Sequence, residues 1–312
     1  MSFSIGKVVK FNIFGASHDI CVGGSLEGLP AGTKIDFERI ESDLSRRRPS
    51  AKGETKRVER DDFLFVSGLE DGHTTEAPFT FAIKNEDIKP EDYDKISNIF
   101  RPGHADYSKY IKYSGNAFRS GGGIFSGRMT APIVVAGSVV MDILSKMGIT
   151  IESKIIFGES GTGARIKVSV YGVKAGVGEP FFDSFESEIA HAMFSIPAVK
   201  GVNFGEIENL YSKKIEDIYD EYDIKEGEPE LKHNYWGGVD GGITNGEEIY
   251  FYTLLKPIQT HDFPVQTVDK EYNALNVKFG GRHDKNISKR VQVVLESMTA
   301  IVLYDLIRRG SK

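Results

Sequence analysis

The segment Phe100-Arg101-Pro102-Gly103-His104-Ala105-Asp106-Tyr107 places a guanidinium and an imidazole within four residues of each other. Pro102 fixes one backbone angle and Gly103 permits unusual ones, so the turn can direct Arg101 and His104 into one space. Arginine binds anions through a permanent forked charge, and histidine is the commonest acid–base group near neutral pH. The segment predicts acid–base chemistry beside an anion, although a polar surface turn has the same composition.

Two further histidines are candidates on different grounds. His18 follows a predicted strand over residues 5–14 and is flanked by Gly15, Ala16 and Ser17. Small neighbours at a strand end leave a side chain accessible, so His18 is a candidate for function as well as for a plain hydrogen-bonding role. His191 lies in a predicted helix from Phe182 to Met193, and there we expect a hydrogen-bonded core histidine.

A cationic run follows the first predicted helix. Arg46, Arg47 and Arg48 precede Pro49, and four more cations come soon after, Lys52, Lys56, Arg57 and Arg60. Cations at a helix C-terminus are favoured by the macrodipole, and a charge run is often a solvated face. Seven cations within fifteen residues of a chain with net charge −6 also form a local positive field that attracts a multiply charged anion.

Glycine clusters mark further candidate ligand contacts. Gly121-Gly122-Gly123 precedes a predicted helix, where free backbone N–H groups can cradle a phosphate. The segment matches neither the Walker loop nor the dinucleotide fingerprint. A second glycine-dense loop covers residues 235–246, and Gly281-Arg282-His283-Asp284 sets a cation, an imidazole and a carboxylate side by side.

The elements that must position these residues are mixed. A helix capped by Asp36 carries Phe37, Ile40 and Leu44 on one face and ends at Pro49. Two strands lie within residues 63–83, and further strands are predicted over 165–173 and 249–255. Helices over 132–144 and 288–309 are apolar around most of their circumference, which predicts burial, whereas residues 212–232 read as an exposed excursion. The pattern predicts an α+β layered fold with helices packed between sheets.

Composition limits the class of protein. The 312 residues are 40% hydrophobic and 27% charged, as in an ordinary globular protein, and the acidic balance gives no global basic field for nucleic acid. We expect no membrane span and no secretory signal, because no run of about 18 apolar residues is present. Cys21 is the only cysteine, which fits a reducing cytoplasm.

Several of these segments occur together in the order found in one family. They are Phe14-Gly15-x-Ser17-His18, Arg46 to Pro49, Phe100 to Tyr107, Gly121 to Thr130, Ala190-His191-Ala192, Ala198-Val199-Lys200-Gly201-Val202, Lys256-Pro257 and Gly281 to Asp284. The sequence resembles chorismate synthase from Gly6 to about Arg309, which implies one domain over residues 1–312. The resemblance implies a β-α-β sandwich with buried central helices between antiparallel sheets, and a cytoplasmic homotetramer.

The family likeness also implies an activity. It is the last step of the shikimate pathway in aromatic amino-acid biosynthesis, a 1,4-anti elimination of phosphate from 5-enolpyruvylshikimate-3-phosphate (EPSP) that requires reduced FMN. By motif position, His18 would protonate the departing phosphate, His104 would keep the flavin reduced and anionic, and Asp284 would assist deprotonation at flavin N5. The implied substrate ligands are Arg46, Arg47, Arg48, Arg101, Arg128 and Arg282, with Lys52 and Arg57 in a loop that closes over the site. The positions that line FMN in the family are Ser126, Pro197, Ala198, Gly241, Lys256, Thr260 and Arg282.

The chain departs from the family pattern at two motifs. Ala16 and Asp19 replace a glutamate and a glycine beside His18, and Ile124-Phe125 replaces Arg-Ser in the glycine-rich segment. These changes keep a non-catalytic flavin- or phospholigand-binding relative open as an alternative. An RNA-binding protein using residues 46–60 is disfavoured by the acidic balance and by the lack of interleaved aromatic residues. The resemblance accounts for the whole chain, so we expect an external flavin reductase or another source of reduced FMN.

Overall fold

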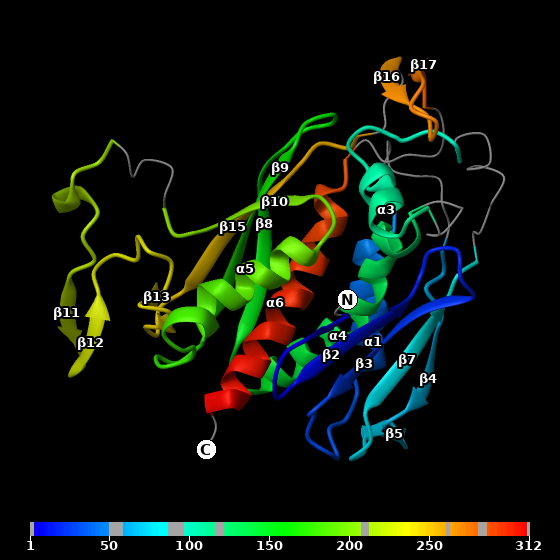
Figure 1. Cartoon of the computed structure of the whole chain (residues 1–312). Coiled ribbons are helices and arrows are strands. Elements are labelled where there is room, and N and C mark those ends of the chain that lie inside the picture. The colour runs from blue at the N-terminus through cyan, green and yellow to red at the C-terminus, as the bar shows by residue number, and fades with distance from the viewer. Residues whose placement is uncertain are drawn as a thin grey trace.

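The computed structural model describes residues 3–49, 59–86, 97–115, 122–206, 212–259, 263–279 and 286–310. Two antiparallel sheets enclose a layer of long helices (Figure 1). The buried apolar residues form a connected cluster that includes both sheets and the helices between them. The predicted class, α+β with central helices between antiparallel sheets, is confirmed.

The first sheet has the strand order β1-β2-β3-β7-β4, and all its neighbouring strands are antiparallel. Its strands are β1 (Ser4–Ile5), β2 (Lys10–Gly15), β3 (Cys21–Glu27), β4 (Phe63–Ser67) and β7 (Phe79–Lys84). The predicted single strand over 5–14 is wrong, because the chain turns between β1 and β2. There the Asp305 carboxylate accepts hydrogen bonds from the backbone N–H groups of Lys7, Val8 and Val9, and Gly6 has a φ of +93°.

The second sheet has the order β10-β15-β9-β8 and is also antiparallel. Its strands are β8 (Thr150–Gly158), β9 (Ala164–Tyr171), β10 (Val199–Phe204) and β15 (Ile249–Leu255). Six of the seven residues of β15 are buried, and the predicted strand over 249–255 is confirmed with the same bounds.

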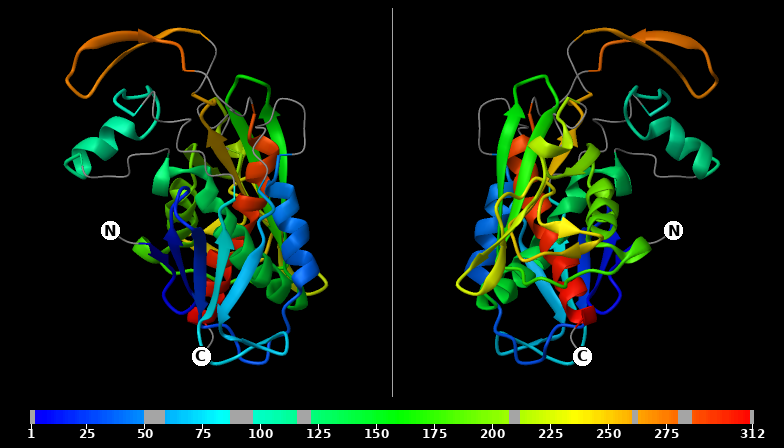
Figure 2. Two further views of the ribbon diagram at one scale, coloured as in Figure 1. Left: turned by 90° about the vertical axis from the view of Figure 1, so that its right-hand side faces the viewer. Right: turned by 90° about the vertical axis from the view of Figure 1, so that its left-hand side faces the viewer.

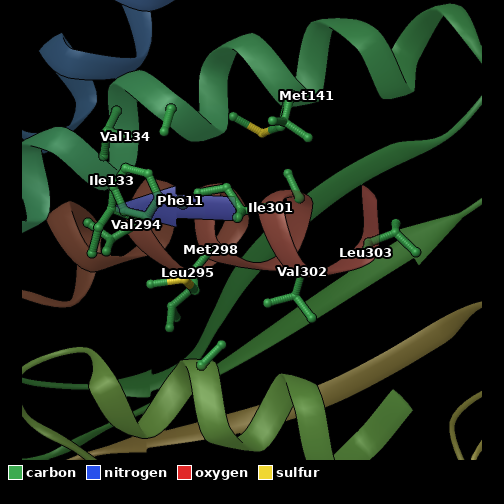
Figure 3. Packing of buried hydrophobic residues seen from close by; sticks show 14 of the residues in the cluster. Phe11, Ile133, Val134, Met141, Val294, Leu295, Met298, Ile301, Val302 and Leu303 are labelled. Carbon is green, nitrogen blue, oxygen red and sulfur yellow. The ribbon is translucent and has the colours of Figure 1, made fainter. Parts of the chain in front are cut away.

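Three helices fill the space between the sheets, α1 (Phe37–Arg47), α4 (Thr130–Lys146) and α6 (Ser288–Gly310). Figure 3 shows Ile133, Val134 and Met141 of α4 opposite the apolar side of α6, and Phe11 of β2 belongs to the same buried cluster. The two helix backbones approach closely at Gly137, where an added Cβ would lie 2.4 Å from the Cα of Ser297. A fourth helix, α5 (Phe185–Ser195), packs against α6 and β10.

By length and composition, the helical stretch Gly127–Lys146 could cross a membrane. However, 83% of its most apolar window is buried within the fold. Burial on nearly all faces is the environment of a core helix, which agrees with the expectation from the sequence.

Short elements extend from this sandwich. Figure 2 shows helix α3 and the β16–β17 hairpin projecting from the same end of the molecule. The short elements are the hairpins β5–β6 (Leu69–Glu70, His73–Thr74), β11–β12 (Tyr222–Lys225, Glu228–Leu231), β13–β14 (Val239–Asp240, Ile243–Thr244) and β16–β17 (Val265–Val268, Ala274–Val277), the helix α3 (Asp106–Lys112), and the 3₁₀ turns η1 (Gly123–Phe125), η2 (Gly127–Met129), η3 (Phe181–Asp183) and η5 (Ile215–Asp217).

Candidate functional site

The turn between β2 and β3 carries His18. Gly15 enters this turn with a φ of +87°, and an added Cβ would lie 2.3 Å from the Cys21 carbonyl oxygen, so glycine is required there. Ser17 Oγ lies 2.9 Å from His18 Nδ1, and the Ser17 backbone N–H donates to the Gly123 carbonyl at 3.3 Å. The fold thus brings the predicted His18 segment into contact with the predicted glycine-rich segment.

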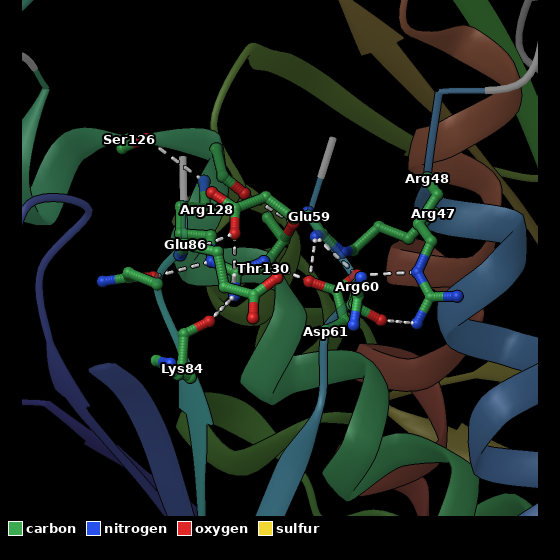
Figure 4. A network of polar contacts seen from close by, with 12 residues as sticks. Arg47, Arg48, Glu59, Arg60, Asp61, Lys84, Glu86, Ser126, Arg128 and Thr130 are labelled. Atoms are coloured by element: carbon green, nitrogen blue, oxygen red, sulfur yellow. Dashed lines mark hydrogen bonds and ion pairs between the residues drawn. The ribbon is translucent and has the colours of Figure 1, made fainter. Parts of the chain in front are cut away.

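A buried carboxylate, Asp61, gathers three of the predicted anion-binding arginines (Figure 4). Arg47 Nη2 lies 3.1 Å and Arg48 Nε 3.3 Å from Asp61 Oδ2, and Arg128 Nη1 pairs with Oδ1. Burial alone would raise the pKa of Asp61, but Arg47 and Arg128 outweigh burial and hold that pKa below its ordinary value. The carboxylate is therefore charged. Glu59 lies 3.9 Å from Arg128 Nη2, so the cluster carries three positive charges against two negative charges.

The arginines of the run differ in their surroundings. Arg47 is fully enclosed, and its burial together with the nearby Arg128 and Arg290 charges lowers the pKa of its guanidinium. Arg46 points away from this cluster. It pairs with Glu296 of α6 at 2.7 Å and with Asp43 of its own helix at 3.1 Å. Arg48 keeps about a third of its side chain exposed. Of the three, Arg48 is the one best placed to contact a ligand while remaining part of the cluster.

Sequence reasoning missed two residues of this cluster, Asp61 and Asn85. Asn85 follows β7 and accepts a hydrogen bond on Oδ1 from Arg128 Nε at 2.9 Å. The only signal for Asp61 was an acidic residue directly after the cation run, at Arg60-Asp61. Asn85 carried no signal, because the pairing of β3 with β7 that brings it to the His18 turn is visible only in the fold.

A second group surrounds His104. Arg101 makes a two-pronged ion pair with Asp106, at 2.7 and 2.9 Å, and Arg101 and His104 both line one pocket with Gln259, Phe263, Val265 and Phe279. Burial and the Arg101 charge lower the pKa of His104, which favours the neutral ring. Its Nδ1 lies 3.1 Å from the Pro102 carbonyl oxygen, which can only accept, so the neutral ring carries its proton on Nδ1 and a lone pair on Nε2.

Neighbouring elements fix this turn from two sides. The Phe100 ring contacts those of Tyr107 and Tyr110, each at 5.3 Å between centroids, and the Phe100 N–H donates to the Val268 carbonyl at the end of β16. Lys256 Nζ donates to the Gly103 carbonyl at 2.5 Å. Burial and the nearby Lys200 charge lower the pKa of Lys256.

The residues expected to line a flavin fall in several places. The Lys256 N–H donates to the carbonyl of Ala198 at 2.9 Å, and Ala198 has a φ of +76°, unusual for a residue with a Cβ. Pro197 precedes it and is exposed, and Ser126 accepts from the Arg128 N–H in the glycine-rich segment. Gly241 lies in the β13–β14 turn, before β15, whereas Lys256 follows β15. Within one chain, the length of β15 therefore lies between Gly241 and Lys256.

Five predicted site residues lie outside the described residues, namely Lys52, Arg57, Thr260, Arg282 and Asp284. His191 is exposed on α5, so its prediction as a core histidine is wrong. The buried face of α5 consists of Phe185, Ile189, Ala192 and Met193, and His191 projects away from it. Within the described part of the chain no cluster of three or more His, Cys, Asp or Glu side chains could hold a metal ion.

Comparison with known proteins shows that this chain is similar to one family over nearly its whole length. The family model for chorismate synthase matches residues 9–159 and 158–307. The chain is 37% identical to the chorismate synthase of Chitinophaga pinensis over 97% of this chain and 95% of that protein. It is also 37% identical to the Korarchaeum cryptofilum chorismate synthase over 98% of each chain. A crystal structure of a chorismate synthase, at 24% identity, matches with a TM-score of 0.75 over 98% of this chain and 93% of that chain, which shows the same fold.

Proposed function

The chain belongs to the chorismate synthase family, whose members are lyases. We propose that it converts EPSP to chorismate and phosphate with reduced FMN. In that elimination the C3 phosphate and a C6 proton leave, and no net oxidation occurs. The observation that carries the proposal is the contact of the His18 turn with a glycine-rich segment that leads directly into a cluster of three arginines.

The substrate class fits the charge of the site. EPSP carries a phosphate and two carboxylates, and the described cluster of Arg47, Arg48 and Arg128 holds two carboxylates, Asp61 and Glu59, against three guanidinium groups. A net positive, largely buried cluster in an acidic protein favours a multiply charged anion. On this proposal, Lys52, Arg57 and Arg282 add to that charge.

The pocket beside His104 offers contacts for part of a flavin. Its lining combines the Phe263 and Phe279 rings with the polar ends of Arg101, His104 and Gln259, and Lys256 stands next to it through Gly103. When bound, reduced FMN supplies transient electron density for phosphate departure. Ser126, Pro197, Ala198 and Lys256 would hold it, together with Thr260 and Arg282.

Each proposed acid–base group then has one task. His104, neutral with its lone pair on Nε2, can accept a proton and thereby keep a neighbouring reduced flavin anionic. His18 donates a proton to a phosphate oxygen as that group departs, which lowers the cost of the leaving group. Asp284 would accept a proton at flavin N5.

Three further proposals follow from the same likeness. We propose a homotetramer. The seven residues of β15, about 23 Å at roughly 3.3 Å per residue, lie between the turn that holds Gly241 and Lys256, and a neighbouring subunit can supply Gly241 more simply. We also propose a cytoplasmic location and an external source of reduced FMN.

An anaerobic assay tests the proposal. Protein, EPSP and photoreduced FMN are mixed, and chorismate and phosphate are measured; equal amounts of both are expected with reduced FMN and neither with oxidised FMN. His191→Ala, at an exposed site on α5, serves as the matched histidine control and should retain full activity. Binding of oxidised FMN without any turnover in the reduced state would instead identify a non-catalytic relative.

A further inference from the structure

We propose that Asn85 is a positioning residue that holds the His18 turn in register with the arginine cluster. The inference rests on the proposed function, since it presumes that His18 transfers the proton. Asn85 is only 5% exposed, and it lies between two groups that the reaction must bring together.

The Asn85 amide contacts the His18 turn on both sides of the histidine. Its Nδ2 donates to the Ala16 carbonyl at 2.9 Å and to the Asp19 carbonyl at 2.8 Å. Its backbone N–H donates to the Ile20 carbonyl at 3.1 Å, which continues the β3–β7 ladder one step past the Cys21–Lys84 pair. The backbone before and after His18 is therefore fixed by one side chain.

The other end of the same amide contacts the arginine cluster. Oδ1 accepts from Arg128 Nε at 2.9 Å, and Arg128 in turn pairs with Asp61. Only one orientation of this amide donates to the Ala16 and Asp19 carbonyls and accepts from the Arg128 guanidinium at the same time. Neither a carboxylate nor a hydroxyl of similar size can supply two donors and one acceptor in this geometry.

This arrangement gives Asn85 a consequence for rate. A proton donor must lie within hydrogen-bond reach of the departing oxygen, and a shift of about 1 Å can cost about 100-fold in rate. Movement of the turn changes the position of His18 and leaves the charges that bind EPSP in place. The effect therefore belongs to kcat more than to KM.

Asn85→Asp is the informative variant, because it keeps an acceptor for Arg128 and removes both donors to the turn. The matched control is Asn12→Asp on the same β2–β3 hairpin, where Nδ2 donates to Ser25 Oγ and Glu27 Oε1 away from the turn. We expect kcat to fall about 100-fold in both Asn85→Asp and Asn85→Ala. KM for EPSP should change less than about 3-fold in Asn85→Ala, which adds no charge beside Arg128. Asn12→Asp should leave both values unchanged.

A second readout does not depend on turnover. Diethyl pyrocarbonate modifies accessible histidines. The folded protein is labelled and then digested, and mass spectrometry of its peptides gives the modification rate of each histidine. We expect His18 to react several-fold faster in Asn85→Asp than in the parent protein, with the rates of His104 and His191 unchanged. If Asn85→Asp gives no folded protein, Asn85→Ala takes its place with the same expectations.

The results separate the two claims. An unchanged His18 labelling rate, or a kcat equal to that of Asn12→Asp, overturns the role of Asn85. If the parent protein shows no turnover, the proposed function fails, and the labelling rates still decide whether Asn85 holds the turn.

Discussion

The Asp61 carboxylate accepts hydrogen bonds from Arg47 Nη2 with both of its oxygens, at 3.2 and 3.1 Å. Arg47 lies in α1 and Asp61 lies two residues before β4, so this buried pair joins the central helix layer to the first sheet. The same carboxylate also contacts Arg48 and Arg128. A structural ion pair thus lies inside the cluster proposed to bind the substrate.

Removing the charge of Asp61 should destabilise the protein strongly. Asp61→Asn leaves the enclosed Arg47 guanidinium without its main counter-charge, and breaking such a pair costs about 3–5 kcal/mol of unfolding free energy. Urea denaturation measures this loss. The adjacent Asp62→Asn, at an exposed side chain, should change the unfolding free energy by less than about 0.5 kcal/mol. Equal effects of the two substitutions would contradict the structural role of Asp61.

Acid should act through the same carboxylate. The pKa of Asp61 is lower in the folded protein than its ordinary value, so the unfolded chain binds the proton more readily. Its contribution to stability is present above about pH 3.9, the unfolded pKa, and is lost as the pH falls through the folded pKa. Urea titrations at falling pH should show the parent protein and Asp61→Asn converging in stability below about pH 4. A constant difference down to pH 2 would argue against a depressed pKa.

Arg48 should contribute to substrate capture. Its guanidinium is partly exposed at the edge of the cluster, and a charge-assisted contact with an anion is worth about 1.5–3 kcal/mol. We expect Arg48→Ala to raise KM for EPSP by about 10-fold or more with a smaller change in kcat. Arg39→Ala, on the same helix and beside Asp43, is the matched control and should keep the parental KM. An unaltered KM in Arg48→Ala would remove Arg48 from the proposed anion site.

His104 should be needed for turnover and dispensable for folding. It lies in an ordered surface turn, so His104→Ala should melt close to the parent protein and lose about 10²–10⁴-fold in kcat. NMR titration of the parent should place its pKa below the ordinary histidine value, because burial and Arg101 disfavour the protonated ring. Full activity in His104→Ala would show that the acid–base role has been assigned to the wrong residue.

The sequence predicted what periodicity and capping determine locally. The helices α1, α4 and α6 and the strand β15 each carry a clear apolar pattern over their length, and they appear near their predicted bounds. The break between β1 and β2 was missed, because Asp305, almost 300 residues away in sequence, binds the backbone there. A contact of that range leaves no trace in local composition.

The site residues also divide into those that local sequence predicted and those that only the fold reveals. Residue type and motif order singled out His18, His104 and the arginines, and the fold brings the first and the last of these into one network. Asp61 and Asn85, which connect that network, depend on the pairing of β3, β7 and β4. His191 was misjudged, since its helix buries a neighbouring face, and only the packing of α5 against α6 shows which face that is.

A crystal structure with oxidised FMN and EPSP, a combination that does not turn over, tests the central claim most directly. The account predicts one cleft in which the His18 ring lies within hydrogen-bond reach of the EPSP phosphate and the His104 ring contacts the flavin, with Asp284 on the same ligands. Ligands bound with His18 and His104 on separate surfaces would contradict it.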